Sequence, residues 1–357
     1  MAGGLAFETQ FGTIYSTNIT PDKATGIGAW TRDEFVQSLR KGVRPNGDHL
    51  YPVFPYTAFT KISDDDANAL YEYFMSVPAV NAPARQNEMK FPFSQRPLLA
   101  LWKALYLEEG AYQADSSKSD EWNRGAYLVE GLGHCSACHS PRNFLGAEKS
   151  SARMTGGEYI DAVASGEMRT WSTPNLTPAK SGLGSWSVED LTDYLKTGRN
   201  AHTETYGPMN EVIMNSTRHL SDADVRAMAT YLNGLSPHEN PAGSAASEPT
   251  LQAGSALYDV HCGTCHLPTG LGSQNEDSGA RLAGNPVVQA SNPAALINVI
   301  LYAPQPPDPP LPKRWNRMEA FGEKLTDEEI AALASFLRSA WGNSGGEVTV
   351  DQVAKQR

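Results

Sequence analysis

The chain of 357 residues lacks three features that would assign it to familiar classes of protein. No apolar run approaches the roughly 20 residues that a helix needs to span a membrane. Basic residues are not in excess, because 29 lysines and arginines stand against 40 aspartates and glutamates, a formal net charge of −11. A nucleic acid is therefore not expected as a partner. A signal peptide is not recognisable at Met1 either.

Cysteine is scarce as well, and its four residues are confined to two short motifs. Each motif is a C-x-x-C pair followed directly by a histidine: Cys135, Cys138 and His139 in the first, and Cys262, Cys265 and His266 in the second. This pattern is typical of covalent c-type haem attachment. The two thiols can add to the vinyl groups of one porphyrin, and the histidine can bind the iron as its proximal ligand. We predict two covalently bound haem c groups in this chain.

Two alternatives use the same cysteines. Together they have the number and type of ligands of a structural zinc site, but a zinc site does not explain why a histidine follows each pair. A redox dithiol normally lies near a βαβ pattern, and the sequence shows none. Haem attachment is therefore the interpretation we adopt.

Two stretches of the chain repeat one another at the size of a domain. Residues 18–42 contain N-I-T-P, G-A-W-T and K-G, and residues 175–198 contain N-L-T-P, G-S-W-S and T-G. The offset is 157 residues between the asparagines and 156 between the tryptophans. In both copies the residue after the tryptophan is a good helix N-cap with an acid three positions later. The repeat therefore indicates two domains of one kind.

The first of these domains is expected to lack its own haem-attachment segment. In the second copy Cys135 precedes Asn175 by 40 residues. The same spacing applied to Asn18 places a matching motif roughly twenty residues before Met1. Truncation and degeneration both explain this. We favour truncation because the other fold signals of the domain are intact.

Three amphipathic helices are expected to close the three units. The sequences I-S-D-D-D, L-S-D-A-D and L-T-D-E-E begin at Ile62, Leu220 and Leu325, and each places a serine or threonine before an acidic first turn. Apolar residues then recur at helical spacing. The helices that precede the haem motifs are expected to cross these closing helices, with Gly125 and Gly254 permitting a close approach.

The sixth iron ligand is expected between each haem motif and its closing helix. Met318 is the only methionine there in the last domain. In the middle domain we choose Met209 over Met214, because the preceding Gly-Pro favours a non-helical approach to the iron. Thioether ligation stabilises ferrous iron, which suits an electron carrier. The first domain has Phe54 at about this place, and His49 is either an alternative ligand or a surface residue.

These phrases resemble the membrane-associated, tri-haem cytochrome c subunits of bacterial periplasmic dehydrogenase complexes of the alcohol, gluconate, sorbitol or fructose type. The resemblance is carried by F-G-T-I-Y-S-T-N-I-T-P at residues 11–21, by E-W-N-R-G-A-Y-L-V-E-G-L-G-H-C-S-A-C-H-S-P-R-N at residues 121–143, and by the two methionine segments. It implies an all-α fold of tandem class I cytochrome c domains, two complete and one N-terminal domain without its C-x-x-C-H. A third haem is expected in a full-length form.

The resemblance also implies an electron-transfer subunit and not a catalytic one. Electrons would enter from a dehydrogenase subunit with a flavin, quinone or molybdenum cofactor and leave to ubiquinone or another respiratory acceptor. The implied location is the periplasm at the outer face of the cytoplasmic membrane, with peripheral membrane association. A di-haem peroxidase and a stand-alone soluble shuttle are the alternatives. The two methionines argue against the peroxidase, which needs an open iron position.

The expected division of the chain is a truncated domain at 1–80, a linker at 81–121, a complete domain at 122–235, a linker at 236–250, a complete domain at 251–341 and a polar tail at 342–357. The first linker contains L-L-A-L-W-K-A-L-Y-L at residues 98–107. This segment is too short to span a membrane. We expect it to pack between the first two domains, and a membrane-surface contact is the alternative.

Overall fold

The computed structural model describes residues 1–162, 166–273, 278–311 and 315–357, and these residues form two compact units. The first unit comprises Met1–Lys118, Ala126–Ala137 and Ile160–Met168, and the second comprises Ser119–Gly125, Cys138–Tyr159 and Arg169–Arg357. The second unit holds most of the expected middle domain and all of the expected last domain. The division into three domains itself stays a prediction.

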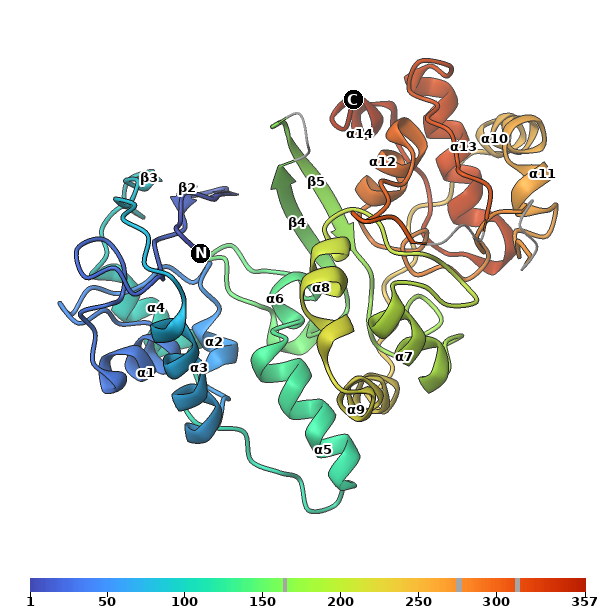
Figure 1. Cartoon of the computed structure of the whole chain (residues 1–357). Helices are drawn as coiled ribbons and strands as arrows, with labels where there is room; N and C mark the ends of the chain where they lie inside the picture. The colour runs from blue at the N-terminus through green and yellow to red at the C-terminus, as the bar shows by residue number, and fades with distance from the viewer. Residues whose placement is uncertain (163–165, 274–277, 312–314) are drawn as a thin grey trace. The chain divides into compact units, whose positions relative to one another are not determined.

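The first 118 residues contain both helices and short strands (Figure 1). The elements are β1 (Ala6–Thr9), β2 (Gly12–Tyr15), α1 (Arg32–Lys41), α2 (Tyr56–Phe59), α3 (Asp64–Ser76), β3 (Glu88–Met89) and α4 (Leu98–Tyr106). The strands form one antiparallel sheet in the order β1-β2-β3, with Phe7 opposite Ile14 and Gly12 opposite Met89. A small core of aromatic and aliphatic side chains joins α1 to α3, including Phe35, Leu39 and Ile62.

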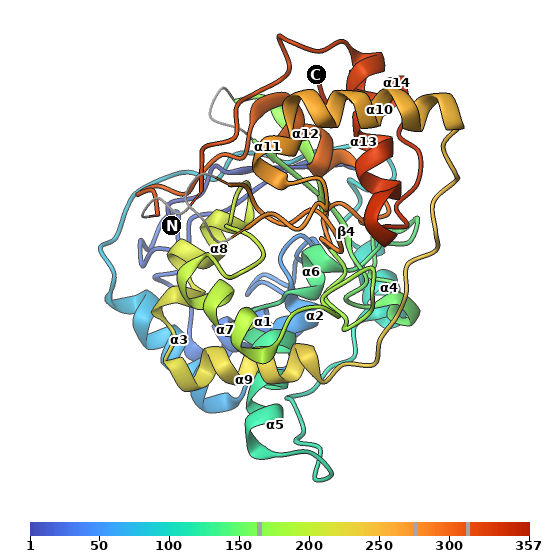
Figure 2. The ribbon, with the colours of Figure 1, turned by 90° about the vertical axis from the view of Figure 1, so that its right-hand side faces the viewer.

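The rest of the chain is mainly helical (Figures 1 and 2). Its helices are α5 (Asp120–Tyr127), α6 (Ser136–His139), α7 (Val188–Thr197), α8 (Met209–Asn215), α9 (Asp222–Asn233), α10 (Glu248–His261), α11 (Gly263–His266), α12 (Ala294–Tyr302), α13 (Asp327–Ser339) and α14 (Val350–Ala354). A π-helical turn over Leu128–Leu132 continues α5, and short 3₁₀ turns lie at Ser150–Ala152, Thr217–His219 and Ala340–Gly342. In the part of the chain that the structure describes, no helix has the length and apolar character to cross a bilayer.

The prediction of a purely α-helical fold is too narrow. Besides the three-stranded sheet, β4 (Gly157–Ala162) pairs with β5 (Met168–Thr173). The strands hold β-branched and aromatic residues such as Ile14, Tyr15, Ile160 and Trp171, which favour extended backbone. Segments of four to six residues give too short a periodic signal to stand out in the sequence.

The internal repeat is confirmed in detail by α1 and α7. Both helices begin with a capping box, Thr31 with Glu34 and Ser187 with Asp190, and both end at a glycine in the left-handed region, Gly42 and Gly198. The asparagine of each copy accepts a hydrogen bond from the threonine two positions on and donates one to a carbonyl 62 or 63 residues later. These sets are Asn18, Thr20 and Val80, and Asn175, Thr177 and His238.

The three closing helices are also confirmed. They are α3, α9 and α13, and in each the N-cap hydroxyl of Ser63, Ser221 or Thr326 accepts a hydrogen bond from the N–H three positions later. An added Cβ on Gly125 of α5 would lie 1.9 Å from the carbonyl oxygen of Ala227 in α9. Gly254 of α10 meets α13 in the same way. The predicted close crossings therefore exist, and only glycine fits at them.

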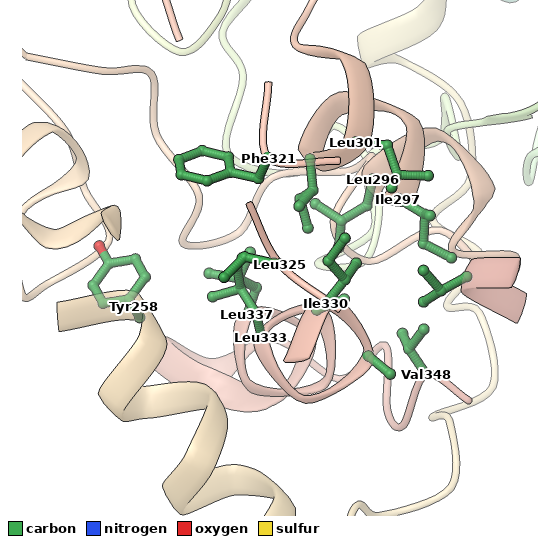
Figure 3. Close-up of a cluster of buried hydrophobic side chains, with 14 of the residues drawn as sticks. Tyr258, Leu296, Ile297, Leu301, Phe321, Leu325, Ile330, Leu333, Leu337 and Val348 are labelled. Atoms are coloured by element: carbon green, nitrogen blue, oxygen red, sulfur yellow. The ribbon is translucent and has the colours of Figure 1, made fainter. Parts of the chain in front are cut away.

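A large hydrophobic core lies in the last domain (Figure 3). Ile330, Leu333 and Leu337 of α13 point into it, where they meet side chains of α10 and α12. Each of these aliphatic side chains contributes about 1.5–3 kcal/mol when it is fully buried. This core fixes α10, and with it the turn that follows α10 and carries the second haem motif.

Candidate haem-binding sites

The histidine of the first motif is held by one specific contact. The backbone carbonyl oxygen of Pro174 lies 2.9 Å from Nδ1 of His139. A carbonyl only accepts hydrogen bonds, so Nδ1 carries the proton and Nε2 keeps its lone pair for a metal. Burial lowers the pKa of His139 below its ordinary value, and the hydrogen bond to Pro174 opposes that shift. The neutral imidazole, which is the form that binds iron, is therefore favoured.

The second motif repeats this arrangement. The carbonyl oxygen of Ala280 lies 2.6 Å from Nδ1 of His266, and burial lowers the pKa of this imidazole too. Burial also raises the pKa of the Cys262 thiol to about 12. A redox-active dithiol needs a low thiol pKa, so the dithiol alternative is disfavoured at this motif.

No disulfide bond joins any of the four cysteines. Among the described residues, no group of three or more histidine, cysteine or acidic side chains lies close enough to hold a metal ion. The arrangement of these side chains therefore gives no support to a zinc site made by the four cysteines.

Sequence reasoning missed the two dipeptides that hold the histidines. In the middle domain the Thr173 hydroxyl donates to the carbonyl of Cys138, and the next residue, Pro174, accepts from His139. In the last domain the Gly279 N–H donates to the carbonyl of Cys265, and Ala280 accepts from His266. The dipeptides lie 35 and 14 residues after their histidines. That irregular spacing left no motif to find.

Each haem motif also has a glycine packed closely against it. An added Cβ on Gly279 would lie 2.7 Å from Cε1 of His266, and one on Gly157 would lie 2.6 Å from the carbonyl oxygen of Cys138. Both are closer than real Cβ contacts allow. The donor chemistry and these close backbone approaches fit a histidine that is held in place to bind haem iron.

The predicted sixth ligands lie in different local structures. Met318 is half-buried between α12 and α13 and packs against the core of the last domain. Met209 is half-buried and is the first residue of α8, with Pro208 as the N-cap. The expected non-helical approach is therefore wrong for Met209 itself, although Gly207 just before it has a positive φ of 60°. Proline favours the first turn of a helix, and this explains the difference.

Other methionines of the middle domain are placed differently. The sulfur of Met214 lies 3.3 Å from Nη1 of Arg218. Met154, which lies in the same interval of the chain, is 2% exposed, and its N–H donates to the Ser140 hydroxyl beside the haem motif. The full burial of Met154 is best explained by a role in core packing. Met209 and Met318 remain the predicted ligands.

The matching stretch of the first domain carries no thioether. Phe54 packs edge-on against Phe59 with ring centroids 5.3 Å apart, within the core of α1 and α3. Nδ1 of His49 is buried and has no hydrogen-bond partner among the described residues. Burial and the charge of Lys103 lower the pKa of His49. Both residues are thus partly enclosed, and His49 is not a simple surface histidine.

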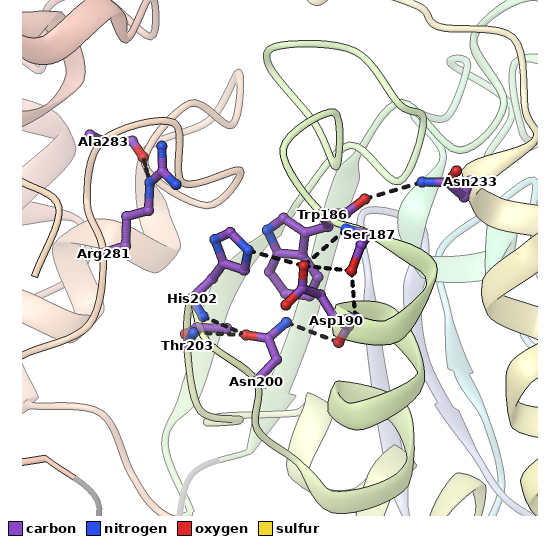
Figure 4. Close-up of polar contacts among 9 residues, drawn as sticks. All are labelled: Trp186, Ser187, Asp190, Asn200, His202, Thr203, Asn233, Arg281 and Ala283. Atoms are coloured by element: carbon purple, nitrogen blue, oxygen red, sulfur yellow. Dashed lines mark hydrogen bonds and ion pairs between the residues drawn. The ribbon is translucent and has the colours of Figure 1, made fainter. Parts of the chain in front are cut away.

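A single peptide group links the second haem motif to the middle domain. The carbonyl of the Ala280–Arg281 peptide accepts from His266, and its N–H donates to the carbonyl of His202 at 3.2 Å. The His202 ring stacks on Trp186 with centroids 5.3 Å apart, and its Nε2 lies 3.4 Å from a carboxylate oxygen of Asp190 (Figure 4). The predicted haem ligand His266 of the last domain therefore connects, through this peptide group, to an aromatic pair of the middle domain.

Two family models of the cytochrome type match this chain. The cytochrome c family model matches residues 123–236, and the family described as cytochrome C oxidase, cbb3-type, subunit III matches residues 249–337. The fold and the two sites therefore define a c-type cytochrome with covalently bound haem c.

Curated relatives specify the family. The fructose dehydrogenase cytochrome subunit of Gluconobacter japonicus is 39% identical over all of this chain and 77% of its own length. The gluconate 2-dehydrogenase cytochrome c subunit of Pantoea cypripedii is 37% identical over all of this chain and 83% of its own length. A nicotinate dehydrogenase subunit of Pseudomonas putida is 42% identical over 94% of this chain, which spans 28% of that protein. The chain belongs to the family of cytochrome c subunits of dehydrogenase complexes.

Proposed function

We propose that this chain is an electron-transfer subunit with two haem c groups, one at each C-x-x-C-H motif. Cys135 and Cys138 attach the first, and Cys262 and Cys265 attach the second. The single observation that supports this proposal best is the matched hold on His139 and His266, each fixed through Nδ1 by a backbone carbonyl. That hold presents Nε2 to an iron atom and keeps the imidazole from turning.

The protein residues set the position and the environment of the cofactor. Bound haem supplies a one-electron couple between ferric and ferrous iron. The backbone carbonyls of Pro174 and Ala280 increase the basicity of the proximal imidazoles. Met209 and Met318 would supply the remaining protein ligand of each iron, and an iron held in this way would have no open position for substrate. Residues that hold the group rigidly would keep reorganisation small during electron transfer.

We place the chain between a dehydrogenase and the respiratory chain. The names of the relatives describe subunits of dehydrogenases that act on fructose, gluconate and nicotinate. By analogy the donor is a dehydrogenase subunit with a flavin, quinone or molybdenum cofactor, and the acceptor is ubiquinone or another respiratory component. The site of action is the periplasmic face of the cytoplasmic membrane, where c-type haem is attached in bacteria.

Haem stoichiometry is the direct test of this function. The chain should be produced with a cytochrome c maturation system, and its haem should be counted by the pyridine haemochrome assay under denaturing conditions. Two covalent haems per chain are expected, and a Cys262→Ser/Cys265→Ser variant should retain one. A colourless protein, or one that gains only zinc, would contradict the proposal.

Spectra of methionine variants test the sixth ligands. Ferric haem with histidine and methionine ligands has a weak red absorption band, and Met209→Ala and Met318→Ala should each remove about half of it. Met214→Ala and Met154→Ala are the matched controls and should leave the band intact. If Met154→Ala removed it and Met209→Ala did not, the assignment in the middle domain would be wrong.

Peroxide separates a carrier from an enzyme. With both irons six-coordinate, added hydrogen peroxide should leave the ferric spectrum unchanged and should not be consumed faster than by free buffer. Rapid turnover of peroxide would favour the di-haem peroxidase alternative. Copurification with a large dehydrogenase subunit would argue against a stand-alone shuttle.

A further inference from the structure

Helix α4 turns three of its leucines to solvent, while Lys103 and the ring of Trp102 face the first domain. Leu98, Leu101 and Leu105 are 50%, 64% and 61% exposed, and their spacing places them on one face of the helix. Lys103 lies on the opposite face, is 8% exposed, and donates to the carbonyl oxygens of Lys41 and Gly42 at the end of α1. The inner face of α4 therefore packs on the first domain, and the face that carries Leu98, Leu101 and Leu105 is exposed.

The orientation of α4 follows from the carbonyl groups at the C-terminus of α1. The last carbonyls of a helix need donors, and the helix dipole makes that end attractive to a cation. Lys103 supplies both, and its ammonium also lies 5.2 Å from the centre of the Tyr56 ring. Holding Lys103 in this place forces the leucines on the far side of α4 into solvent.

A groove rich in arginine is lined in part by residues 84–96, the segment that precedes α4 in the chain. Its volume is about 360 Å³, and its lining includes Arg44, Arg85 and Arg96 together with Ser94 and Asn87. No aspartate or glutamate is among the residues that line it. In a chain of net charge −11, such a cluster of guanidinium groups is an exception.

The arginines are held ready for a ligand. The Arg96 guanidinium lies 4.8 Å from the centre of the Tyr51 ring and donates to the carbonyl oxygen of His49. Arg85 lies 3.9 Å from the centre of the Tyr15 ring and pairs with exposed Glu88 at 3.1 Å. For the Arg44 side chain, no hydrogen bond or ion pair to another described residue is present. Several N–H donors therefore remain for an anion.

The groove and the leucine face are joined by the chain between them. Phe91 is 82% exposed and lies between Met89 and Ser94, which both line the groove. Arg96 of the groove is two residues from Leu98, where α4 begins. Exposed apolar side chains next to guanidinium groups that keep spare N–H donors are the combination that binds the surface of an anionic bilayer.

We propose that this face, made of Arg44, Arg85, Arg96, Phe91 and the leucines of α4, binds the phosphate headgroups and upper acyl region of anionic phospholipids. The arginines pair with phosphate oxygens, as guanidinium groups do with two oxygens at once. Phe91 and the leucines enter the boundary between headgroups and acyl chains. The proposal rests on the proposed function only in placing the chain at a membrane surface.

Vesicle flotation of the haem-loaded protein tests the proposal. Vesicles of phosphatidylcholine alone are compared with vesicles that contain about one quarter phosphatidylglycerol. Binding should be stronger to the anionic vesicles by roughly 10-fold to 100-fold and should weaken with sodium chloride. Equal binding to both vesicles, or binding to neither, would overturn the proposal.

Variants separate the two parts of the face. Leu101→Gln/Leu105→Gln should abolish flotation, whereas Arg44→Gln/Arg85→Gln should remove the preference for anionic vesicles. Leu271→Gln, at a leucine 50% exposed in the second unit, and Lys355→Gln are the matched controls and should bind like the parent. Leucine variants that still float normally would contradict the role of α4.

Two further experiments would identify a ligand of this face other than a lipid. Inorganic phosphate that released the protein at an ionic strength where chloride did not would show a site for free phosphate and overturn the lipid assignment. Loss of a copurifying dehydrogenase subunit in the leucine variants, without vesicle binding by the parent, would show a protein interface instead. Unchanged haem content in all variants would leave the proposed electron-transfer function intact in either case.

Discussion

The first and middle domains share a framework but differ in how their closing helices are buried. Both carry the same capping box, the same C-cap glycine and the same asparagine contacts. Yet α3 buries one residue, Ala67, whereas α9 buries six. Tyr73 of α3 is 52% exposed, and Tyr231, at the matching position of α9, is 6% exposed. Local framework and helix burial therefore have separate causes.

The cause of the difference is the crossing helix. In α9, Ala227 receives Gly125, and Tyr231 packs against Trp122 with ring centroids 4.9 Å apart. The same arrangement exists in the last domain, where Gly254 meets Ala332 and Phe336. Ala69, the counterpart of Ala227 in α3, is exposed. A closing helix is thus buried by the helix that leads into a haem motif and not by its own sequence.

The largest expected loss of stability comes from a substitution that fills the space where α5 crosses α9. Gly125→Ala should destabilise the middle domain by about 3 kcal/mol or more, because the new methyl group meets backbone that cannot turn aside. Gly131→Ala is the control, since an added Cβ there makes only an ordinary contact at 3.6 Å with Lys61. Denaturant unfolding followed by far-ultraviolet circular dichroism measures both. Equal losses of stability in the two variants would contradict the explanation that the crossing helix buries α9.

The next largest loss of stability is expected when the buried ring of Tyr231 is removed. Tyr231→Ala should cost about 3 kcal/mol, because a buried ring and its contact with Trp122 are lost. Tyr73→Ala, at the equivalent exposed position, should cost no more than about 1 kcal/mol. The same unfolding measurement compares them. A large cost at Tyr73 would show that α3 is covered in solution, and it would remove the contrast between the domains.

The smallest expected effect is a pH dependence of the middle domain. Burial lowers the pKa of His202, reinforced by the charge of Arg281 and opposed by Asp190. The unfolded chain then binds a proton more readily than the folded one. The stability that comes from burying the neutral His202 ring is therefore present above about pH 6.5 and is lost as pH falls below it. A His202→Asn variant should lose that slope. Unfolding free energies at several pH values test the difference, and an unchanged slope would contradict it.

Much of the framework was predictable because it depends on residues close together in the chain. Caps, left-handed glycines and the amphipathic faces of α3, α9 and α13 require only neighbours within a few positions. The strands were missed because they are short. The start of α8 at Met209 was missed because proline can either break a helix or begin one.

The sequence by itself determined the chemistry of this protein, since C-x-x-C-H twice, with capped helices around each copy, specifies covalent haem and a helical enclosure. Tertiary structure alone decided which backbone carbonyls hold His139 and His266, which glycines face a neighbouring backbone, and which face of α4 meets solvent. The physical reason is that motif and cap are local properties of the chain. Those contacts join residues 14 to more than 100 positions apart and exist only after the elements have packed.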